Sequence, residues 1–219
     1  MIETHNLRFR YSPQTPEWTF PDVQCAAGER LLLLGASGSG KTTLLHLMSG
    51  LLKPASGQIR LANTDWSTLS GAAADRFRGR HVGIVFQRPH FVQSLTVAEN
   101  LGLPLFLAGL APDPARVREL LEALGIGDKA GARPRDLSVG EQQRAGIARA
   151  LVHRPSVVFA DEPTSALDDR STEAVVSLLE HHSAQVGASL LIVTHDNRLR
   201  DRYPRHLSLS PLTSDSPLS

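Results

Sequence analysis

The sequence predicts an α/β protein with a mainly parallel sheet, an antiparallel β subdomain at the N-terminus and an inserted α-helical subdomain. Two short apolar runs, RLLLLG at 30–35 and SVVFAD at 156–161, end in a glycine or an acid. Such runs are typical of strands buried on both faces, as in parallel sheets. Helical patterns between strand patterns favour an α/β core, and the continuous helical pattern at 90–154 indicates an insertion.

Length and composition indicate one globular domain. The chain has 219 residues, 41% of them hydrophobic, a net charge of +1 and a single cysteine, Cys25. This charge offers no electrostatic reason to expect a nucleic-acid partner, and one cysteine excludes an internal disulfide. The start of the chain lacks the pattern of a signal peptide, and no stretch of 18 apolar residues occurs. We expect one domain over 1–210, followed by a disordered tail at 211–219.

The N-terminal part predicts short strands. The apolar residues of MIETHNLRFRY predict a half-buried strand, and EWTFPDVQ at 17–24 is a candidate antiparallel neighbour. Further strands are expected in GQIRLAN at 57–63 and HVGIVFQ at 81–87. The apolar positions of the first strand are Ile2, Leu7, Phe9 and Tyr11.

The later elements carry helix signals. Thr96 with Glu99 forms a capping box, and Asp113 before Pro114 predicts a second helix start. A third helix ends before Pro155, and the pattern STEAVVSLLEHHSAQVG predicts a fourth, followed by the strand SLLIVTH. The core and β subdomain therefore comprise 1–89 and 155–210, and the helical subdomain comprises 90–154.

The segment LLLLGASGSGKTTLLHLMSG contains a phosphate-binding loop. Gly35, Gly40, Lys41 and Thr42 match the pattern G-x-x-x-x-G-K-S/T between a predicted strand and a predicted helix. Glycines let backbone N–H groups point inward, and the positive end of the helix favours anionic phosphate. Lys41 supplies a point charge, and the Thr42 hydroxyl is an oxygen ligand for Mg²⁺. This predicts a core of the P-loop NTPase type. The expected phosphate contacts are Gly35, Ala36, Ser37, Gly38, Ser39, Gly40, Lys41, Thr42 and Thr43.

Two acids follow the second apolar run. Asp161 and Glu162 come at its carboxyl end, the edge at which ligands bind in open α/β sheets. We expect Asp161 to hold Mg²⁺ and Glu162 to orient the attacking water or accept its proton.

Over nearly its whole length the chain resembles the ATP-binding subunit of ABC transporters. LSVGEQQR at 137–144 resembles the family signature LSGGQ, and SALD at 165–168 resembles the D-loop. Gln87 ends an apolar strand like the Q-loop glutamine, His195 in IVTHD stands where the switch histidine does, and Tyr11 matches the adenine-stacking aromatic residue. The order of these motifs agrees with the family.

The resemblance implies that ATP lies between the phosphate loop of one copy and the signature of a second copy in a closed homodimer. Ser138 and the backbone of Gly140 would contact the γ-phosphate from the second copy, and His195 would contact it from the first. Gln87 would contact Mg²⁺ and water, and Tyr11 would stack on adenine. The expected catalytic residues are Glu162, His195, Gln87 and Lys41, and the expected metal ligands are Thr42, Gln87 and Asp161.

The resemblance also implies an integral membrane permease-type partner, which would hold the chain on the cytoplasmic face of the inner (plasma) membrane. The segment 88–105 is the expected docking site, where Phe91, Val92 and Leu95 are either contact residues or core residues. Within the family, the motifs are most similar to those of lipoprotein-releasing and macrolide-export ATPases. No nucleic acid is expected.

Two residues of the signature depart from the family pattern. Val139 replaces a glycine and Glu141 replaces the glutamine. A β-branched residue is strained if this position needs a positive φ. Two other hypotheses stand beside the transporter. One is a nucleotide-gated clamp with negligible turnover, for which Val139 is the only indication, and the other is a soluble ABC-type ATPase acting on nucleic acid or ribosomes.

Overall fold

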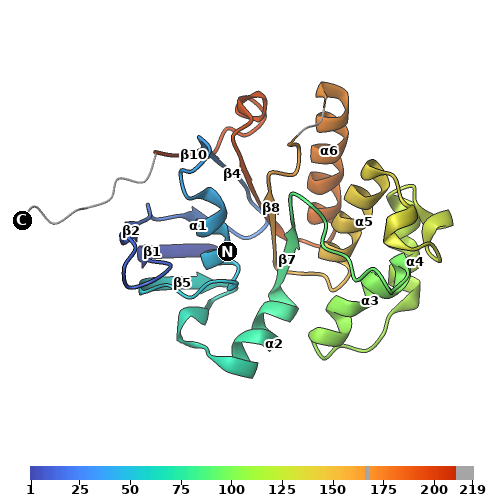
Figure 1. The fold of residues 1–219 in the computed structure, drawn as a ribbon, viewed down its shortest axis with the longest axis horizontal. Coiled ribbons are helices and arrows are strands. Elements are labelled where there is room, and N and C mark those ends of the chain that lie inside the picture. The colour runs from blue at the N-terminus through green and yellow to red at the C-terminus, as the bar shows by residue number, and fades with distance from the viewer. Residues whose placement is uncertain (166–167, 211–219) are drawn as a thin grey trace, which may run out of the picture.

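A parallel sheet of five strands forms the centre of the computed structural model, which describes residues 1–165 and 168–210 (Figure 1). The strand order is β10-β4-β9-β8-β7, and all four pairings are parallel. The expected tail at 211–219 and residues 166–167 of SALD lie outside the described residues. The strands are β4 (Arg30–Gly35), β7 (Val82–Val85), β8 (Val157–Asp161), β9 (Ser189–Thr194) and β10 (His206–Leu209).

A separate antiparallel sheet is built from the N-terminal third of the chain. Its order is β2-β1-β5-β6, and β3 also pairs with β1. The expected antiparallel partner at 17–24 is confirmed, because Phe9 pairs with Trp18 and Glu3 with Gln24. The strands are β1 (Ile2–Phe9), β2 (Trp18–Thr19), β3 (Gln24–Cys25), β5 (Ser56–Leu61) and β6 (Thr64–Asp65).

Strand β1 is interrupted by a bulge. Asn6 has a φ of 51°, and the register with β5 shifts between His5 and Arg8. In a regular strand, residues five positions apart face opposite sides of the sheet. Because of the bulge, Ile2 and Leu7 can both face the core. Opposite the bulge, a Cβ on Gly57 would lie 2.5 Å from the Asn6 carbonyl oxygen, so only glycine fits.

Tyr11 was expected in this strand, and that prediction is wrong. Strand β1 ends at Phe9, and the Tyr11 side chain is 58% exposed.

Six α-helices pack against the sheets in the described chain. The helix starts predicted after Thr96 and Asp113 are confirmed. Thr96 and Ser138 each form a capping box, with Glu99 and Glu141 respectively. Helix α2 was not predicted, because none of its residues is buried and it carries no apolar stripe. The helices are α1 (Lys41–Met48), α2 (Gly71–His81), α3 (Val97–Leu107), α4 (Pro114–Ala123), α5 (Val139–Leu151) and α6 (Asp169–Gln185).

Strand β4 is buried on both faces, as its four leucines predict. Leu31 and Leu33 pack in a core shared with α1 and the antiparallel sheet. Leu32 and Leu34 pack in the opposite core, which includes residues of α3, α4, α5 and α6. Helix α1 is therefore enclosed between the two sheets, whereas α3, α4 and α5 lie together on the other side of the parallel sheet (Figure 1).

The parallel register brings functional segments to one edge of the sheet. Leu34 pairs with Thr194, and Asp161 pairs with Val193. The segments that follow β4, β8 and β9 therefore begin side by side. None of the helices within residues 1–165 and 168–210 combines the length and the apolar character needed to cross a membrane.

Gly83 is required by the packing of β7 on α5, and we expect Gly83→Ala to destabilise the protein. The added Cβ would lie 2.2 Å from the carbonyl oxygen of Ala150, which is backbone and cannot easily move. Overpacking of this kind costs about 1–3 kcal/mol in the free energy of unfolding. Urea unfolding measures the change.

Gly102→Ala is the matched control. Gly102 lies inside α3, and an added Cβ there meets nothing within 4 Å. Helix propensity predicts a gain of up to about 1 kcal/mol at this site. Equal stability changes at the two glycines would contradict the packing argument.

Candidate functional site

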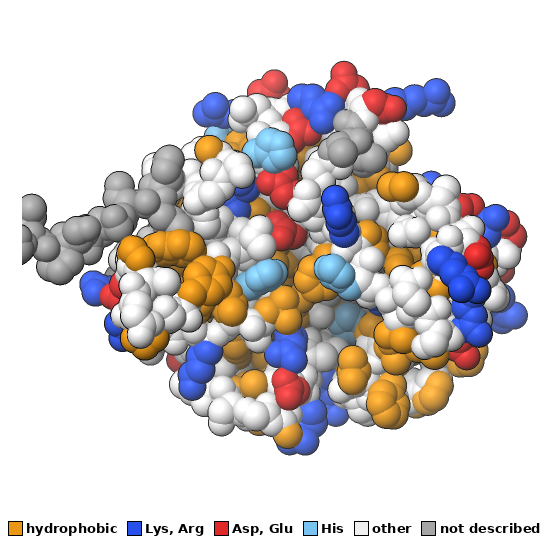
Figure 2. Space-filling view, in the orientation of Figure 1, with side chains coloured by type: hydrophobic (Ala, Val, Ile, Leu, Met, Phe, Trp, Pro, Cys, Tyr) orange, Lys and Arg blue, Asp and Glu red, His pale blue; other side chains and the backbone are white. Residues whose placement is uncertain are grey.

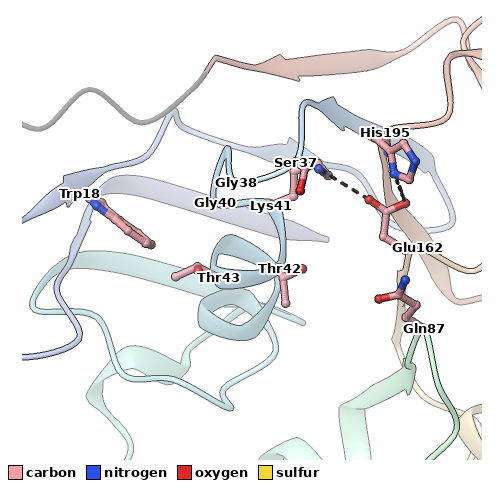
Figure 3. Close-up of a pocket in the computed structure, with 10 residues that line it drawn as sticks. All are labelled: Trp18, Ser37, Gly38, Gly40, Lys41, Thr42, Thr43, Gln87, Glu162 and His195. Atoms are coloured by element: carbon pink, nitrogen blue, oxygen red, sulfur yellow. Dashed lines mark hydrogen bonds and ion pairs between the residues drawn. The ribbon is translucent and has the colours of Figure 1, made fainter. Parts of the chain in front are cut away.

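A cavity of about 470 Å³ lies at the carboxyl edge of the parallel sheet (Figure 3). It is open to solvent and brings together residues from the phosphate loop, α1, β2 and the ends of β7, β8 and β9. The lining residues are Trp18, Ser37, Gly38, Gly40, Lys41, Thr42, Thr43, Gln87, Glu162 and His195.

The loop between β4 and α1 has the backbone that its glycines predict. Gly38 and Gly40 have φ values of 80° and 83°, which side chains rarely allow. At Gly35 the constraint is space, because a Cβ would lie 2.5 Å from the Ser39 Oγ and 2.9 Å from the Leu209 carbonyl oxygen. The Ser39 Oγ is buried and has no hydrogen-bond partner within the described chain. The Ser39 side chain is therefore enclosed by the loop, and it does not line the cavity.

Lys41 lies at the start of α1, and its side chain is almost fully buried. Its Nζ donates hydrogen bonds to the carbonyl oxygens of Gly35 and Ala36, each at 2.9 Å. It also lies 3.6 Å from the Glu162 Oε1. The ammonium group is thus held beside the phosphate loop, and Lys41 lines the cavity.

Thr42 and Asp161 are joined by a hydrogen bond between two side-chain oxygen atoms. The Thr42 hydroxyl donates to the Asp161 Oδ1 at 3.1 Å. Burial raises the pKa of Asp161 above its ordinary value, and the hydrogen bond from Thr42 acts in the opposite direction. Asp161 is itself buried at the end of β8 and is not among the residues that line the cavity, whereas Thr42 is.

Glu162 turns the chain sharply away from β8. Its φ is 46°, a conformation that costs a non-glycine residue of the order of 1–3 kcal/mol. Its N–H donates to the Val193 carbonyl oxygen at 2.8 Å, which holds the turn against β9. The side chain then points back toward Lys41 (Figure 3).

Two further groups hold the Glu162 carboxylate. The hydroxyl of Thr194 donates to its Oε2, and the Nδ1 of His195 lies at the same oxygen, both at 2.9 Å. The backbone N–H of His195 also donates to it, at 3.3 Å. Glu162 is therefore a fixed negative charge between Lys41 and His195.

Gln87 lies two residues after β7, on the same side of α1 as Glu162 (Figure 3). Its Nε2 donates to the Ser165 Oγ at 3.1 Å, which connects the segments that follow β7 and β8. Its side chain points into the cavity near Glu162 (Figure 3).

One aromatic side chain lines the cavity, and another lies next to it. Trp18 lines the cavity, whereas Tyr11 stands beside it and is absent from the lining. The Tyr11 hydroxyl is hydrogen-bonded to the Thr43 Oγ1 at 2.8 Å, and the ring meets Trp18 at 5.5 Å between centroids.

The signature residues lie away from this cavity. Ser138, Val139 and Gly140 are exposed at the start of α5, and none of the three lines the cavity. Val139 is the first residue of the helix and does not have a positive φ, so its β-branched side chain is not strained there. The side chain is 78% exposed.

Sequence reasoning missed two residues of the site, Trp18 and Thr194. Trp18 had a usable signal, because an antiparallel partner at 17–24 brings a third aromatic residue beside Phe9 and Tyr11. Thr194 had none, since a threonine at the end of a buried strand is an ordinary strand residue.

We expect Asp161→Asn to stabilise the ligand-free protein at neutral pH. A raised pKa means that Asp161 contributes stability at low pH which is lost as pH rises through its folded-state pKa. Asparagine carries no charge and can still accept the Thr42 hydrogen bond. The variant should therefore gain stability over the parent at pH 7.5, and the difference should shrink toward pH 4, as measured by urea unfolding.

Asp196→Asn should give the opposite pH dependence. The hydrogen bonds from Arg198 lower the pKa of Asp196. Its contribution to the free energy of unfolding is therefore present at neutral pH and is lost as pH falls. An Asp161→Asn protein less stable than the parent at pH 7.5 would show that burial does not penalise this carboxylate.

Comparison with known proteins confirms the resemblance. The family described as "ABC transporter" matches residues 21–165. The lipoprotein-releasing system ATP-binding protein LolD of Shewanella oneidensis is 42% identical over 192 residues, covering 86% of this chain and 83% of that protein. LolD of Legionella pneumophila is 42% identical over 190 residues, covering 86% and 84%.

Solved structures agree with the predicted fold. The dimeric ATP-binding cassette MJ0796, described as bound to ADP and Pi in a post-hydrolysis state, has a TM-score of 0.85 and 30% identity over 95% of this chain and 94% of its own. A second dimeric structure of the same cassette gives a TM-score of 0.85 and 31% identity over 96% and 95%. The cavity geometry, the family match and these relatives together show that the chain belongs to the ABC transporter family, as an ATP-binding and ATP-hydrolysing subunit.

Proposed function

We propose that this chain is the ATPase subunit of a transporter of the lipoprotein-releasing type, with its ATP held between two copies of the chain. The observation that carries the proposal is the ion pair between Lys41 and Glu162 in the wall of the cavity, 3.6 Å apart, in a chain 42% identical to LolD. The positive charge of Lys41 can bind the phosphates, and the Glu162 carboxylate can orient the attacking water.

The phosphate loop would hold the nucleotide. Backbone N–H groups over residues 35–43 and the positive end of α1 suit the phosphate oxygens. Lys41 would exchange its contacts with the Gly35 and Ala36 carbonyl oxygens for contacts with phosphate, a stronger acceptor.

The residues also fit Mg²⁺. Thr42 and Asp161 offer two oxygen atoms 3.1 Å apart, and the Gln87 side chain faces the same cavity. Oxygen donors are what this hard cation prefers. Bound there, Mg²⁺ would neutralise phosphate charge. It would also relieve the penalty of holding the Asp161 carboxylate in a buried place.

Glu162 is the proposed general base. It would orient a water molecule toward the γ-phosphorus and accept the proton as the new P–O bond forms and the bond to ADP breaks. His195 already contacts Glu162 at 2.9 Å and would donate to a γ-phosphate oxygen. Gln87, whose side chain lies near Glu162 in the cavity, would help to position the same water.

A second copy of the chain would complete the site. Ser138 and Gly140 are exposed at the amino end of α5, where helical N–H groups favour an anion. The solved relatives with this fold are described as dimers. A two-fold pairing would bring each signature against the phosphate loop of the other copy. Because the Ser138 hydroxyl donates to the Glu141 carboxylate at 2.8 Å, this contact would have to open as phosphate arrives.

The relaxed backbone at Val139 removes the main reason to favour a clamp with negligible turnover. The Val139 side chain points into solvent and leaves the Ser138 cap intact. Family membership favours the transporter over an ATPase that acts on nucleic acid.

A membrane subunit would dock on a second cavity of about 380 Å³ between α2, β7 and α3. Val92 lines it, whereas Phe91 packs against the core with the Arg149 guanidinium 4.7 Å from its ring centroid. Leu95 does not line it. Hydrophobic side chains gather on the surface over α3 in Figure 2. This surface supports a permease-type partner that holds the chain at the cytoplasmic face of the inner membrane.

The proposed division of the chain follows these surfaces. Residues 1–89 and 155–210 would form the core with the β subdomain, and residues 90–154 the helical subdomain. The cavity of the phosphate loop lies in the first part, and the signature lies in the second.

Glu162→Gln should retain ATP and stop hydrolysis. Loss of the base at an unchanged shape should reduce phosphate release at least about 100-fold. The unhydrolysed nucleotide should hold two copies together. Phosphate release and light-scattering mass, both with ATP and Mg²⁺, measure the two effects.

Lys41→Ala is the control for binding. With ATP present, its light-scattering mass should remain that of one subunit. It should also bind little nucleotide in equilibrium dialysis, because the cavity loses its main cation. Undiminished ATP uptake by Lys41→Ala, or a Glu162→Gln protein that hydrolyses ATP like the parent, would refute the proposed roles.

Leu107→Asp should disrupt docking of the membrane subunit without affecting ATP binding. Leu107 is 68% exposed and lines the second cavity, so a carboxylate there would lose its hydration when a partner covers it. Co-purification with the membrane subunit from detergent extracts should fall at least about tenfold.

Phe106→Asp is the matched control on the same helix. Phe106 is 78% exposed but lines a different cavity on the other side of α3. Equal loss of the partner with both variants would place docking elsewhere on α3.

A further inference from the structure

We propose that Lys129, a residue outside every motif of the sequence, sets how strongly the signature of one copy binds the γ-phosphate held by the other copy. Lys129 would do so by neutralising the carboxylate of Glu141, which lies directly against Ser138. The role rests on the proposed function, because it concerns the same site shared by two copies. It adds to that site a pair of charges that the expected contacts of Ser138 and Gly140 do not include.

Glu141 brings a negative charge to the signature. Its Oε2 accepts hydrogen bonds from the backbone N–H of Ser138 at 2.7 Å and from the Ser138 hydroxyl at 2.8 Å. These hydrogen bonds, and to a smaller degree Lys129, lower the pKa of Glu141, so the group is a carboxylate at neutral pH. The glutamine of the family pattern would bring no charge to this place.

A carboxylate so close to Ser138 works against the binding of phosphate. If the Ser138 hydroxyl turns to a γ-phosphate oxygen, that oxygen lies two hydrogen bonds away from the Glu141 Oε2, at most about 5.5 Å. The Debye length at physiological ionic strength is about 8 Å, so salt screens the repulsion between these two negative charges only partly. Without a compensating cation, Glu141 would therefore weaken the contact that joins the two copies.

Lys129 supplies the compensating cation. Its Nζ lies 3.4 Å from the Glu141 Oε1 and 3.5 Å from the Asp128 Oδ2. The charges of Glu141 and Asp128 raise the pKa of Lys129, which keeps the ammonium group protonated. Because the hydrogen bonds from Ser138 go to the Oε2 of Glu141, Lys129 uses the other oxygen. The ion pair can therefore persist while the Ser138 hydroxyl changes its acceptor.

The backbone around Lys129 holds the ammonium group near the signature. Lys129 ends the short 3-10 helix η2 (Gly127–Lys129), which follows α4. Its N–H donates to the Ile126 carbonyl oxygen at 3.1 Å, and its own carbonyl oxygen accepts from the Ala132 N–H at 3.0 Å. The side chains of Lys129 and Glu141 are only 35% and 19% exposed. Solvent ions therefore screen this pair less than a fully exposed one.

Removal of the lysine charge should weaken the ATP-bound dimer. In a Glu162→Gln background with ATP and Mg²⁺, Lys129→Met should raise the dimer dissociation constant about tenfold, about threefold for each of the two shared sites. The effect should shrink at high salt, because both charges lie near solvent. Binding of ATP to a single copy should not change, since its phosphate loop is intact. Light scattering over a range of protein concentrations measures the dimer, and equilibrium dialysis measures nucleotide binding.

Three variants separate the effect of charge from an effect on folding. Lys129→Arg keeps the charge and should stay near the Glu162→Gln background. Lys53→Met removes an exposed lysine between α1 and β5 and should have no effect on the dimer. Glu141→Gln removes the negative charge, and glutamine can still form the capping box. Added to Lys129→Met, it should restore the dissociation constant to near that of the background, whereas a purely structural role of Lys129 would not be rescued in this way.

The outcomes distinguish the role of Lys129 from the proposed function. If the Glu162→Gln protein forms no dimer with ATP, the shared site fails and both proposals are overturned. If the dimer forms but Lys129→Met weakens it no more than Lys53→Met does, the role of Lys129 is overturned and the shared site stands. The same conclusion holds if Glu141→Gln does not rescue Lys129→Met. Thermal unfolding by circular dichroism checks that each variant is folded.

Discussion

The enclosure of helix α1 between two sheets is the constraint on which the site depends. Leu44, Leu45, Leu47 and Met48 are fully buried against both sheets. Each such side chain contributes about 1.5–3 kcal/mol of hydrophobic free energy, so α1 cannot shift without a large loss of stability. Because the phosphate loop is the direct continuation of this helix, the core sets where the loop lies relative to the two sheets.

The charged groups around the loop are held by other groups of the same chain. Lys41 is held by two carbonyl oxygens and by Glu162, which in turn is held by Thr194 and His195. Asp161 is the exception, since burial works against its negative charge. A magnesium–nucleotide complex would therefore meet a site in which one carboxylate gains from a cation and one lysine exchanges neutral acceptors for phosphate.

The two proposed interfaces lie on helices that pack against each other. The exposed signature begins α5, and the surface proposed for the membrane partner includes α3, which packs on α5. Gln87 leads from the nucleotide cavity toward this pair of helices, and it contacts Ser165 beyond β8. The two proposed interfaces are therefore connected through the packing of α3 on α5.

The sequence by itself determined the buried strands, the phosphate loop and the acids at the end of β8, because continuous leucines, paired glycines and helix caps are local signals. It also determined the family, through motifs in order. Only the tertiary structure decided that β1 carries a bulge, that the exposed α2 exists, and that Trp18 rather than Tyr11 lines the cavity. These features depend on which distant segments pair and which side of a ring is covered. Three-dimensional contacts specify such relations, and a local pattern of apolar and polar residues does not.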